Sequence, residues 1–121
     1  MLFRTFHSQE ERRAYGGSAF VELQFCKLPV GTNEKKIVAV SSIDHWQNDS
    51  LYIHMNDIEL FYREYRSVFG DIDLWGINYY APAKIQPFIE IIRAKKPADH
   101  AVLIDWLHKA KNYNGFYILG I

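Results

Sequence analysis

Five histidines are the side chains in this sequence with the most potential for metal or acid–base chemistry. They are His7, His45, His54, His100 and His108. Zinc ligands usually come as short-spaced pairs, whereas His100 and His108 are eight positions apart and would point about 80° apart on a helix. Asp105 and His108 could share a metal, but two ligands without a third do not make a site. The sequence therefore predicts no metal site and no cofactor site.

A histidine beside a carboxylate could act as a general base, and two such pairs occur here. Asp44 precedes His45, and Asp57 follows His54 by three positions. Neighbouring side chains rarely face each other, and the sequence has no Gly-x-Ser-x-Gly elbow, phosphate-binding glycine loop or His-Glu-x-x-His helix. We therefore predict no catalytic residue and no enzyme. A small metal-independent enzyme or nucleic-acid processing factor that uses a His/carboxylate pair remains the alternative.

The chain has a single cysteine, Cys26, at the end of an apolar run that begins at Phe20. A single cysteine excludes an internal disulfide and is typical of a reducing compartment. In an apolar run, a buried structural thiol is a better interpretation than a nucleophile.

Charge is distributed unevenly along the chain, although the total is zero. Residues 41 to 80 carry two basic and seven acidic side chains, and the segments on either side are net positive. The acids of this middle segment are Asp44, Asp49, Asp57, Glu59, Glu64, Asp71 and Asp73. An acidic surface attracts basic partners and repels nucleic acid, so we expect a cationic protein partner and no nucleic acid.

Length and composition place the chain among single globular domains. It has 121 residues, of which 49% are hydrophobic and 16% aromatic. That length is sufficient to bury one core without metal or disulfide staples. No apolar stretch approaches the roughly 20 residues of a membrane span, so we expect residues 1 to 121 to form one cytoplasmic domain without membrane contact.

Hydrophobic periodicity predicts strands first and helices later. Expected strands cover 18–28, 36–42, 51–55, 71–80 and 116–121, with the first two forming a hairpin across 29–35. Expected helices cover 56–69, a segment from Pro82 to Ile92, and 97–112. Asn56 and Glu59 would form a capping box, and Gly70 would end the first helix. Pro87 requires the second helix to kink or its regular part to begin there.

These elements predict an α+β fold in which a mainly antiparallel sheet packs against about three helices.

The expected strand 71–80 contributes three large aromatic side chains, Trp75, Tyr79 and Tyr80. We expect Trp75 to lie in the core and one of Tyr79 and Tyr80 to be exposed, because consecutive strand residues point to opposite faces. An exposed tyrosine could anchor a partner.

Several segments in the second half of the chain resemble a known class of proteins. They are Gly76-Ile-Asn-Tyr-Tyr80, Lys96-Pro97-Ala-Asp99, Trp106-Leu107 and the terminal Asn114-Gly-Phe-Tyr-Ile-Leu-Gly-Ile121. Over residues 70 to 121 they resemble small bacterial immunity proteins of the contact-dependent growth inhibition and polymorphic toxin type. The resemblance implies a cytoplasmic antidote that binds a cognate toxin domain, often a basic nuclease, and blocks its active site.

The acidic segment and the available aromatics agree with such a role. We therefore expect a partner interface that includes four acids and two tyrosines. These residues are Asp44, Asp49, Asp71, Asp73, Tyr79 and Tyr80.

Overall fold

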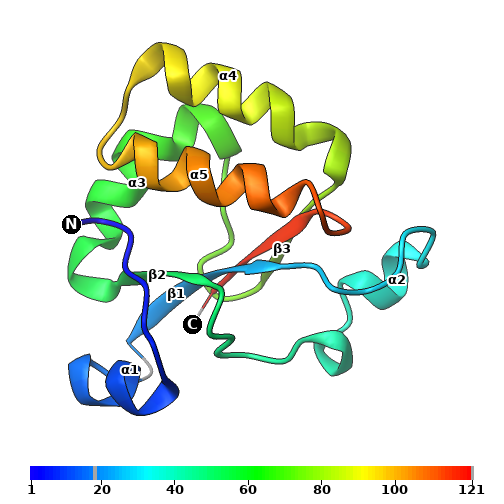
Figure 1. The fold of residues 1–121 in the computed structure, drawn as a ribbon, viewed down its shortest axis with the longest axis horizontal. Helices are drawn as coiled ribbons and strands as arrows, with labels where there is room; N and C mark the ends of the chain where they lie inside the picture. The colour runs from blue at the N-terminus through cyan, green and yellow to red at the C-terminus, as the bar shows by residue number, and fades with distance from the viewer. Residues whose placement is uncertain (18, 121) are drawn as a thin grey trace.

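A four-stranded antiparallel sheet forms the centre of the fold, within the residues 1–17 and 19–120 that the computed structural model describes (Figure 1). The strands are β1 (Phe20–Phe25), β2 (Leu51–His54), β3 (Ile77–Tyr80) and β4 (Phe116–Leu119). Their order across the sheet is β2-β1-β4-β3. The strand nearest the C-terminus therefore lies in the middle, paired with β1 on one side and β3 on the other.

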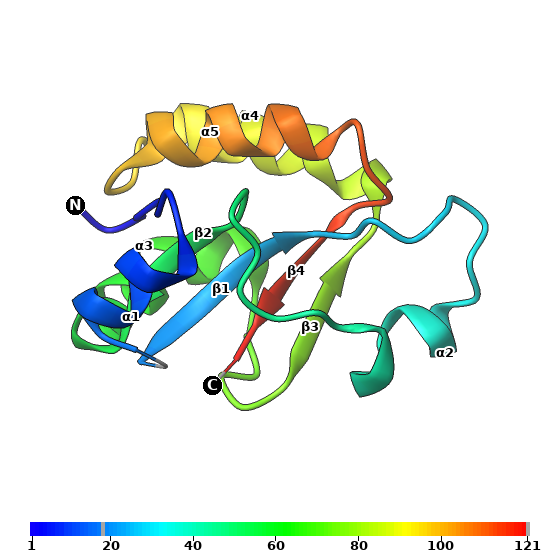
Figure 2. The same cartoon turned by 60° about the horizontal axis from the view of Figure 1, so that its bottom comes forward.

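Three longer helices cover one face of this sheet. They are α3 (Ile58–Phe69), α4 (Ile85–Lys95) and α5 (His100–Ala110). Figure 2 shows α4 and α5 side by side above the strands. Two shorter helices, α1 (Gln9–Tyr15) and α2 (Glu34–Ile37), lie near the opposite ends of the sheet. None of the helices in the described residues is long and apolar enough to cross a membrane.

The main core lies between this face of the sheet and the three helices. The strand side chains Val21, Leu23 and Phe25 point into it, together with Phe116 and Ile118 of β4. Phe25 stacks on Trp106 of α5, with ring centroids 4.3 Å apart. The α+β class with an antiparallel sheet and about three packed helices is thus confirmed.

The opposite face of the sheet is also covered, although by irregular segments. Ile37 of α2 packs there with Cys26, Tyr117 and Leu119 in a second apolar cluster. Phe6, Phe20 and Tyr52 form a third, against which Trp46 packs. All six residues of β1 are consequently buried, including Glu22 and Gln24 on its polar row.

Most predicted elements are found within a few residues of the expected bounds. The strands expected at 18–28, 51–55 and 116–121 are β1, β2 and β4, although residues 18 and 121 lie outside the described part. Gly70 ends α3 with a φ of 74°, as its position predicted. The predicted capping box of Asn56 and Glu59 is wrong. Asn56 lies in a 3₁₀ turn, Met55–Asp57, that precedes α3, and the N-cap Asp57 makes no side-chain cap hydrogen bond.

The strand and hairpin predicted at 36–42 are wrong. That segment forms the end of α2 and a 3₁₀ turn, Val40–Ser42. The two edges of β1 are already taken by β2 and β4, so no edge remains for residues 36–42 to pair with. Of their β-branched side chains, Ile37 packs on the sheet face, whereas Val38 and Val40 are exposed.

Two further predictions are corrected in the detail of their bounds. Of 71–80, only Ile77–Tyr80 is a strand, because residues 73–76 turn. Pro87 does not kink α4, since the helix begins at Ile85 and the proline falls in its first turn, where no intrahelical N–H bond is needed.

The charged stretch that begins at Gln9 forms α1, a helix that we did not predict. It is capped by Ser8 Oγ, which accepts a hydrogen bond from Glu11 N at 3.1 Å.

Candidate functional site

A side-chain amide shapes the turn before β3. Asn78 Oδ1 accepts from Asp73 N at 2.9 Å, and Asn78 Nδ2 donates to Asp73 O at 2.9 Å. Asp73 Oδ1 accepts in turn from Trp75 N at 2.9 Å. These bonds close residues 73–78 into a compact turn that directs Trp75 outward.

Trp75 is therefore at the surface, and the prediction that it lies in the core is wrong. Its exposed fraction is 77%, the highest of the large aromatic side chains. Strand alternation does not apply to Trp75, because the strand begins only at Ile77. A tryptophan at a protein surface leaves a large apolar ring in water, and such rings are concentrated in binding interfaces.

A hollow of about 440 Å³, lined mainly by apolar side chains and also by His45, lies beside Trp75. Its walls include Val38, Val40 and Ile43 from the segment after α2, and Ile77 of β3. Val40 is 80% exposed and Val38 is also exposed. We call the exposed apolar side chains Val38, Val40 and Trp75, with the hollow between them, the Trp75 patch.

Of the four predicted interface acids, Asp73 borders the Trp75 patch and Asp44 follows one of its wall residues in the sequence. Asp44 is exposed and directly follows Ile43 of the hollow. Asp73 is exposed, and its carboxylate lies so close to Gly76, another wall residue, that a Cβ there would collide with it. A side chain at position 76 would therefore displace the Asp73 carboxylate.

The other two acids are paired with cations. Asp49 Oδ2 lies 2.9 Å from Lys27 Nζ, and Asp71 Oδ1 lies 3.0 Å from Arg66 Nη2. Asp71 also accepts from the Tyr62 hydroxyl at 3.2 Å. Their charges are partly neutralised within the chain, so Asp44 and Asp73 are the stronger candidates for attracting a cation.

The two predicted tyrosines differ in accessibility. Tyr80 is only 8% exposed and packs among Phe69, Phe88 and Phe116. We correct the expectation that it lies in the partner interface, because its ring is part of the core. Tyr79 is half-buried on the other face, and its hydroxyl donates to Asn114 O at 2.7 Å. Burial raises the pKa of Tyr80 to about 12.

A buried carboxylate holds the segment 43–50 against the sheet, and sequence reasoning missed it. Glu22 of β1 is 1% exposed. Its Oε1 accepts from Trp46 N at 2.9 Å, and its Oε2 accepts from Gln47 N at 3.0 Å and Ser50 Oγ at 2.6 Å. The signal was the acid in the middle of an otherwise apolar strand.

Trp46 is in the left-handed region, with a φ of 67°. This conformation turns two successive N–H groups toward one point, an arrangement that binds anions, and the Glu22 carboxylate fills it. Tyr52 lies beside this carboxylate, and its hydroxyl donates to Gln47 O at 2.5 Å. Burial, with the Glu22 charge adding to it, raises the pKa of Tyr52 to about 12.

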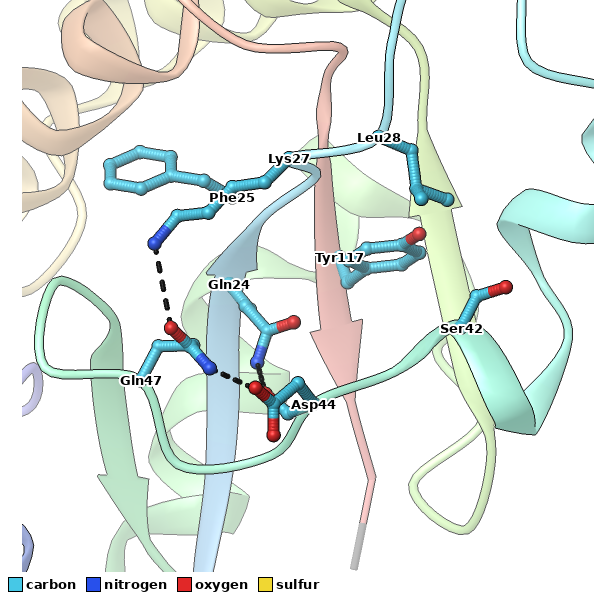
Figure 3. A pocket seen from close by; sticks show the side chains of 8 residues that line it. All are labelled: Gln24, Phe25, Lys27, Leu28, Ser42, Asp44, Gln47 and Tyr117. Carbon is cyan, nitrogen blue, oxygen red and sulfur yellow. Dashed lines mark hydrogen bonds between the residues drawn. The ribbon is translucent and has the colours of Figure 1, made fainter.

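A second, smaller hollow of about 200 Å³ lies where the segment 43–50 crosses β1 and β4 (Figure 3). Gln24 Nε2 donates to Asp44 O at 2.8 Å, and Gln47 Nε2 donates to the same carbonyl at 3.0 Å. Lys27 Nζ lies 3.5 Å from Gln47 Oε1. The two glutamine amides thus hold the main chain of Asp44 in place at the edge of this smaller hollow.

The two histidine–carboxylate pairs lie in different places. His45 lines the hollow beside Trp75 and Asp44 lines the smaller hollow, so these two side chains do not share a site. His54 and Asp57 line a polar hollow of about 320 Å³ with Arg4 and Tyr15. His54 Nδ1 accepts from Asn56 N at 3.1 Å, and Asp57 Oδ2 lies 3.9 Å from Arg4 Nη2. In the described residues no hydrogen bond joins His54 to Asp57 or His45 to Asp44, and no group of three His, Cys, Asp or Glu side chains could hold a metal ion.

Comparison with family models, with curated proteins and with solved structures finds no match to this chain.

Proposed function

We propose that this protein is an immunity protein that binds a cognate, basic toxin domain through the Trp75 patch and blocks its active site. The observation that carries the proposal is Trp75, a 77% exposed ring on a turn built to hold it outward, beside an apolar hollow. The resemblance of residues 70–121 to immunity proteins supplies the toxin as partner.

The composition of the surface supports a protein partner. Specific interfaces combine a buried apolar centre, often with an aromatic anchor, with a polar rim. The Trp75 patch provides the apolar centre, Asp73 lies at its border, and Asp44 lies at the neighbouring smaller hollow. Acids in these positions steer a cationic partner and raise its association rate.

Binding of purified variants to the toxin domain encoded by the adjacent gene tests this proposal. Trp75→Ala should raise the dissociation rate, because an aromatic anchor contributes about 2 kcal/mol or more to binding. Asp44→Lys should slow association and reduce its dependence on salt. Both side chains are exposed, so the melting temperature should stay close to that of the wild type.

Two exposed valines provide a matched control. Val40 lies in the patch and Val30 lies in the loop after Pro29, and their exposed fractions are 80% and 82%. Val40→Ala should weaken binding, and Val30→Ala should leave it unchanged. A wild-type protein that does not bind the adjacent gene product, or equal effects of the two alanine variants, would refute the proposal.

A small enzyme that uses His54 and Asp57 is the alternative function. It is favoured by one observation, the polar hollow that gathers these side chains with Arg4 and Tyr15. It is disfavoured because His54 Nδ1 already accepts a hydrogen bond from Asn56 N. The Asp57 carboxylate lies 3.9 Å from the Arg4 guanidinium and is thus paired with a cation instead of with His54. Protection from the toxin that persists in His54→Ala would separate binding from catalysis.

A further inference from the structure

The two edge strands of the sheet, β2 and β3, differ in whether another segment pairs with their outer side. At the β2 edge, Arg4 N donates to Tyr52 O at 2.9 Å and Tyr52 N donates to Arg4 O at 2.9 Å. The N-terminal segment therefore pairs with β2 and covers its edge. At the other edge, β3 pairs with β4 on its inner side, and no strand of the described residues pairs with its outer side.

The register identifies which groups of β3 point outward. Gly120 N donates to Gly76 O at 2.8 Å, and Asn78 and Tyr80 stand opposite Ile118 and Phe116. In an antiparallel pair, alternate residues direct their N–H and C=O groups to the same neighbour. Residues 76, 78 and 80 therefore face β4, whereas Ile77 and Tyr79 direct their backbone groups away from the sheet.

These outward groups have no hydrogen-bond partner among the described residues. No backbone or side-chain bond to the N–H or C=O of Ile77 or Tyr79 is present on that side. An open strand edge is a template for another strand, and proteins normally protect such edges with charge, proline or a covering segment. Here β2 has a covering segment, and no segment of the described residues pairs with the outer edge of β3 beside the Trp75 patch.

From this juxtaposition we infer that β3 accepts an extended strand of the partner, so that the sheet continues from this chain into the bound protein. The inference rests on the proposed function and adds the mode of binding. Backbone bonds to Ile77 and Tyr79 align the added strand. Since side chains alternate along a strand, one side chain of the added segment enters the apolar hollow walled by Ile77 and Val40.

Charge complementarity indicates a basic segment of another protein rather than a second copy of this chain. Asp73 borders the Trp75 patch at the start of β3, and Asp44, next to Ile43 in the sequence, lines the neighbouring smaller hollow. A two-fold contact would use the same surface on both copies and bring two acidic borders to one interface. A segment with lysine or arginine on one face and apolar side chains on the other satisfies both the acids and the hollow.

Proline at position 77 tests this inference, because the missing N–H faces outward. Proline is tolerated on strand edges when its nitrogen points away from the sheet, so Ile77→Pro should fold. It should weaken binding of the adjacent gene's toxin domain by about 10- to 100-fold, the effect of an unmade buried hydrogen bond. The control Ile77→Val keeps the N–H and should change affinity by less than about fivefold.

Amide hydrogen exchange of the wild-type protein provides a second measurement that does not depend on the folding of the proline variant. The amides of Ile77 and Tyr79 should exchange rapidly in the free protein and slowly in the complex. Toxin binding that leaves these amides unprotected would overturn strand addition while the proposed function stands. Equal affinities of Ile77→Pro and the wild type would do the same.

Two other outcomes would also overturn the inference. If the wild-type protein does not bind the toxin domain, the proposed function fails and strand addition fails with it. If sedimentation shows a dimer of the protein alone that Ile77→Pro dissociates, the open edge serves self-association.

Discussion

Replacing the buried carboxylate of Glu22 by an amide tests whether it holds the segment 43–50 in place. Glu22→Gln keeps the shape of the side chain and removes its charge. The carboxylate accepts four hydrogen bonds, one at Oε1 from Trp46 N and three at Oε2 from Gln24 Nε2, Gln47 N and Ser50 Oγ. An amide has only one oxygen, so its NH₂ group must face at least one of these donors.

The magnitude follows from that count. A hydrogen bond to a charged acceptor contributes about 1.5 to 3 kcal/mol. With the amide oxygen at the Oε2 position, the bond from Trp46 N is lost and the other three become neutral and weaker. The left-handed backbone of Trp46, which costs about 1 to 3 kcal/mol, loses the anion that compensates it. We expect the free energy of unfolding to fall by about 3 kcal/mol, out of a total of about 5 to 15 kcal/mol.

Urea and thermal unfolding measure this change, and a chain of 121 residues should melt about 10 °C lower. Glu59→Gln is the control, because Glu59 is an exposed glutamate on α3 whose carboxylate makes no hydrogen bond to a described residue. It should change the stability by no more than about 0.5 kcal/mol. If Glu22→Gln melts within a degree of the control, the carboxylate does not hold the segment and the reasoning is refuted.

Three further outcomes are expected. Truncation before Phe116 should abolish cooperative unfolding, because it removes the strand paired with both β1 and β3 and buried side chains worth about 1.5 to 3 kcal/mol each; an unchanged melting transition would contradict this. Cys26, which is 0% exposed, should react slowly with a thiol reagent in the native state and rapidly in urea; fast native labelling would show that the thiol is accessible. Ultraviolet titration should show tyrosines that ionise only near pH 12, because burial raises the pKa of Tyr52 and Tyr80 to about 12. The stability that comes from keeping these two rings neutral is complete below about pH 10 and is lost as the pH rises through 12, so ionisation of all eight tyrosines near pH 10 in the folded protein would refute it.

Local patterns in the sequence were sufficient for the elements whose form depends on their own residues. The apolar stripe before Gly70 predicted α3, and the glycine took the positive φ that ends it. The apolar run from Phe116 predicted β4, since a segment with no polar alternation must be buried on both faces. The early strands and later helices predicted the α+β class for the same reason, because hydrophobic periodicity reports which side of each element is buried.

Pairing across long distances decided the rest. Residues 36–42 have strand composition, yet β2 and β4 occupy both edges of β1, so this segment packs on the sheet face instead, and Tyr117 Oη donates to Ile37 O at 2.8 Å. The surface position of Trp75 depends on Asn78, whose amide joins the turn at Asp73 to β4 through Ile118 O.

The burial of Glu22 likewise depends on the segment 43–50, which lies more than twenty residues away in the sequence. Composition and periodicity describe what a segment prefers. The partners that make a tryptophan exposed, a glutamate buried or an edge open come from other parts of the chain, and only the tertiary structure brings them together.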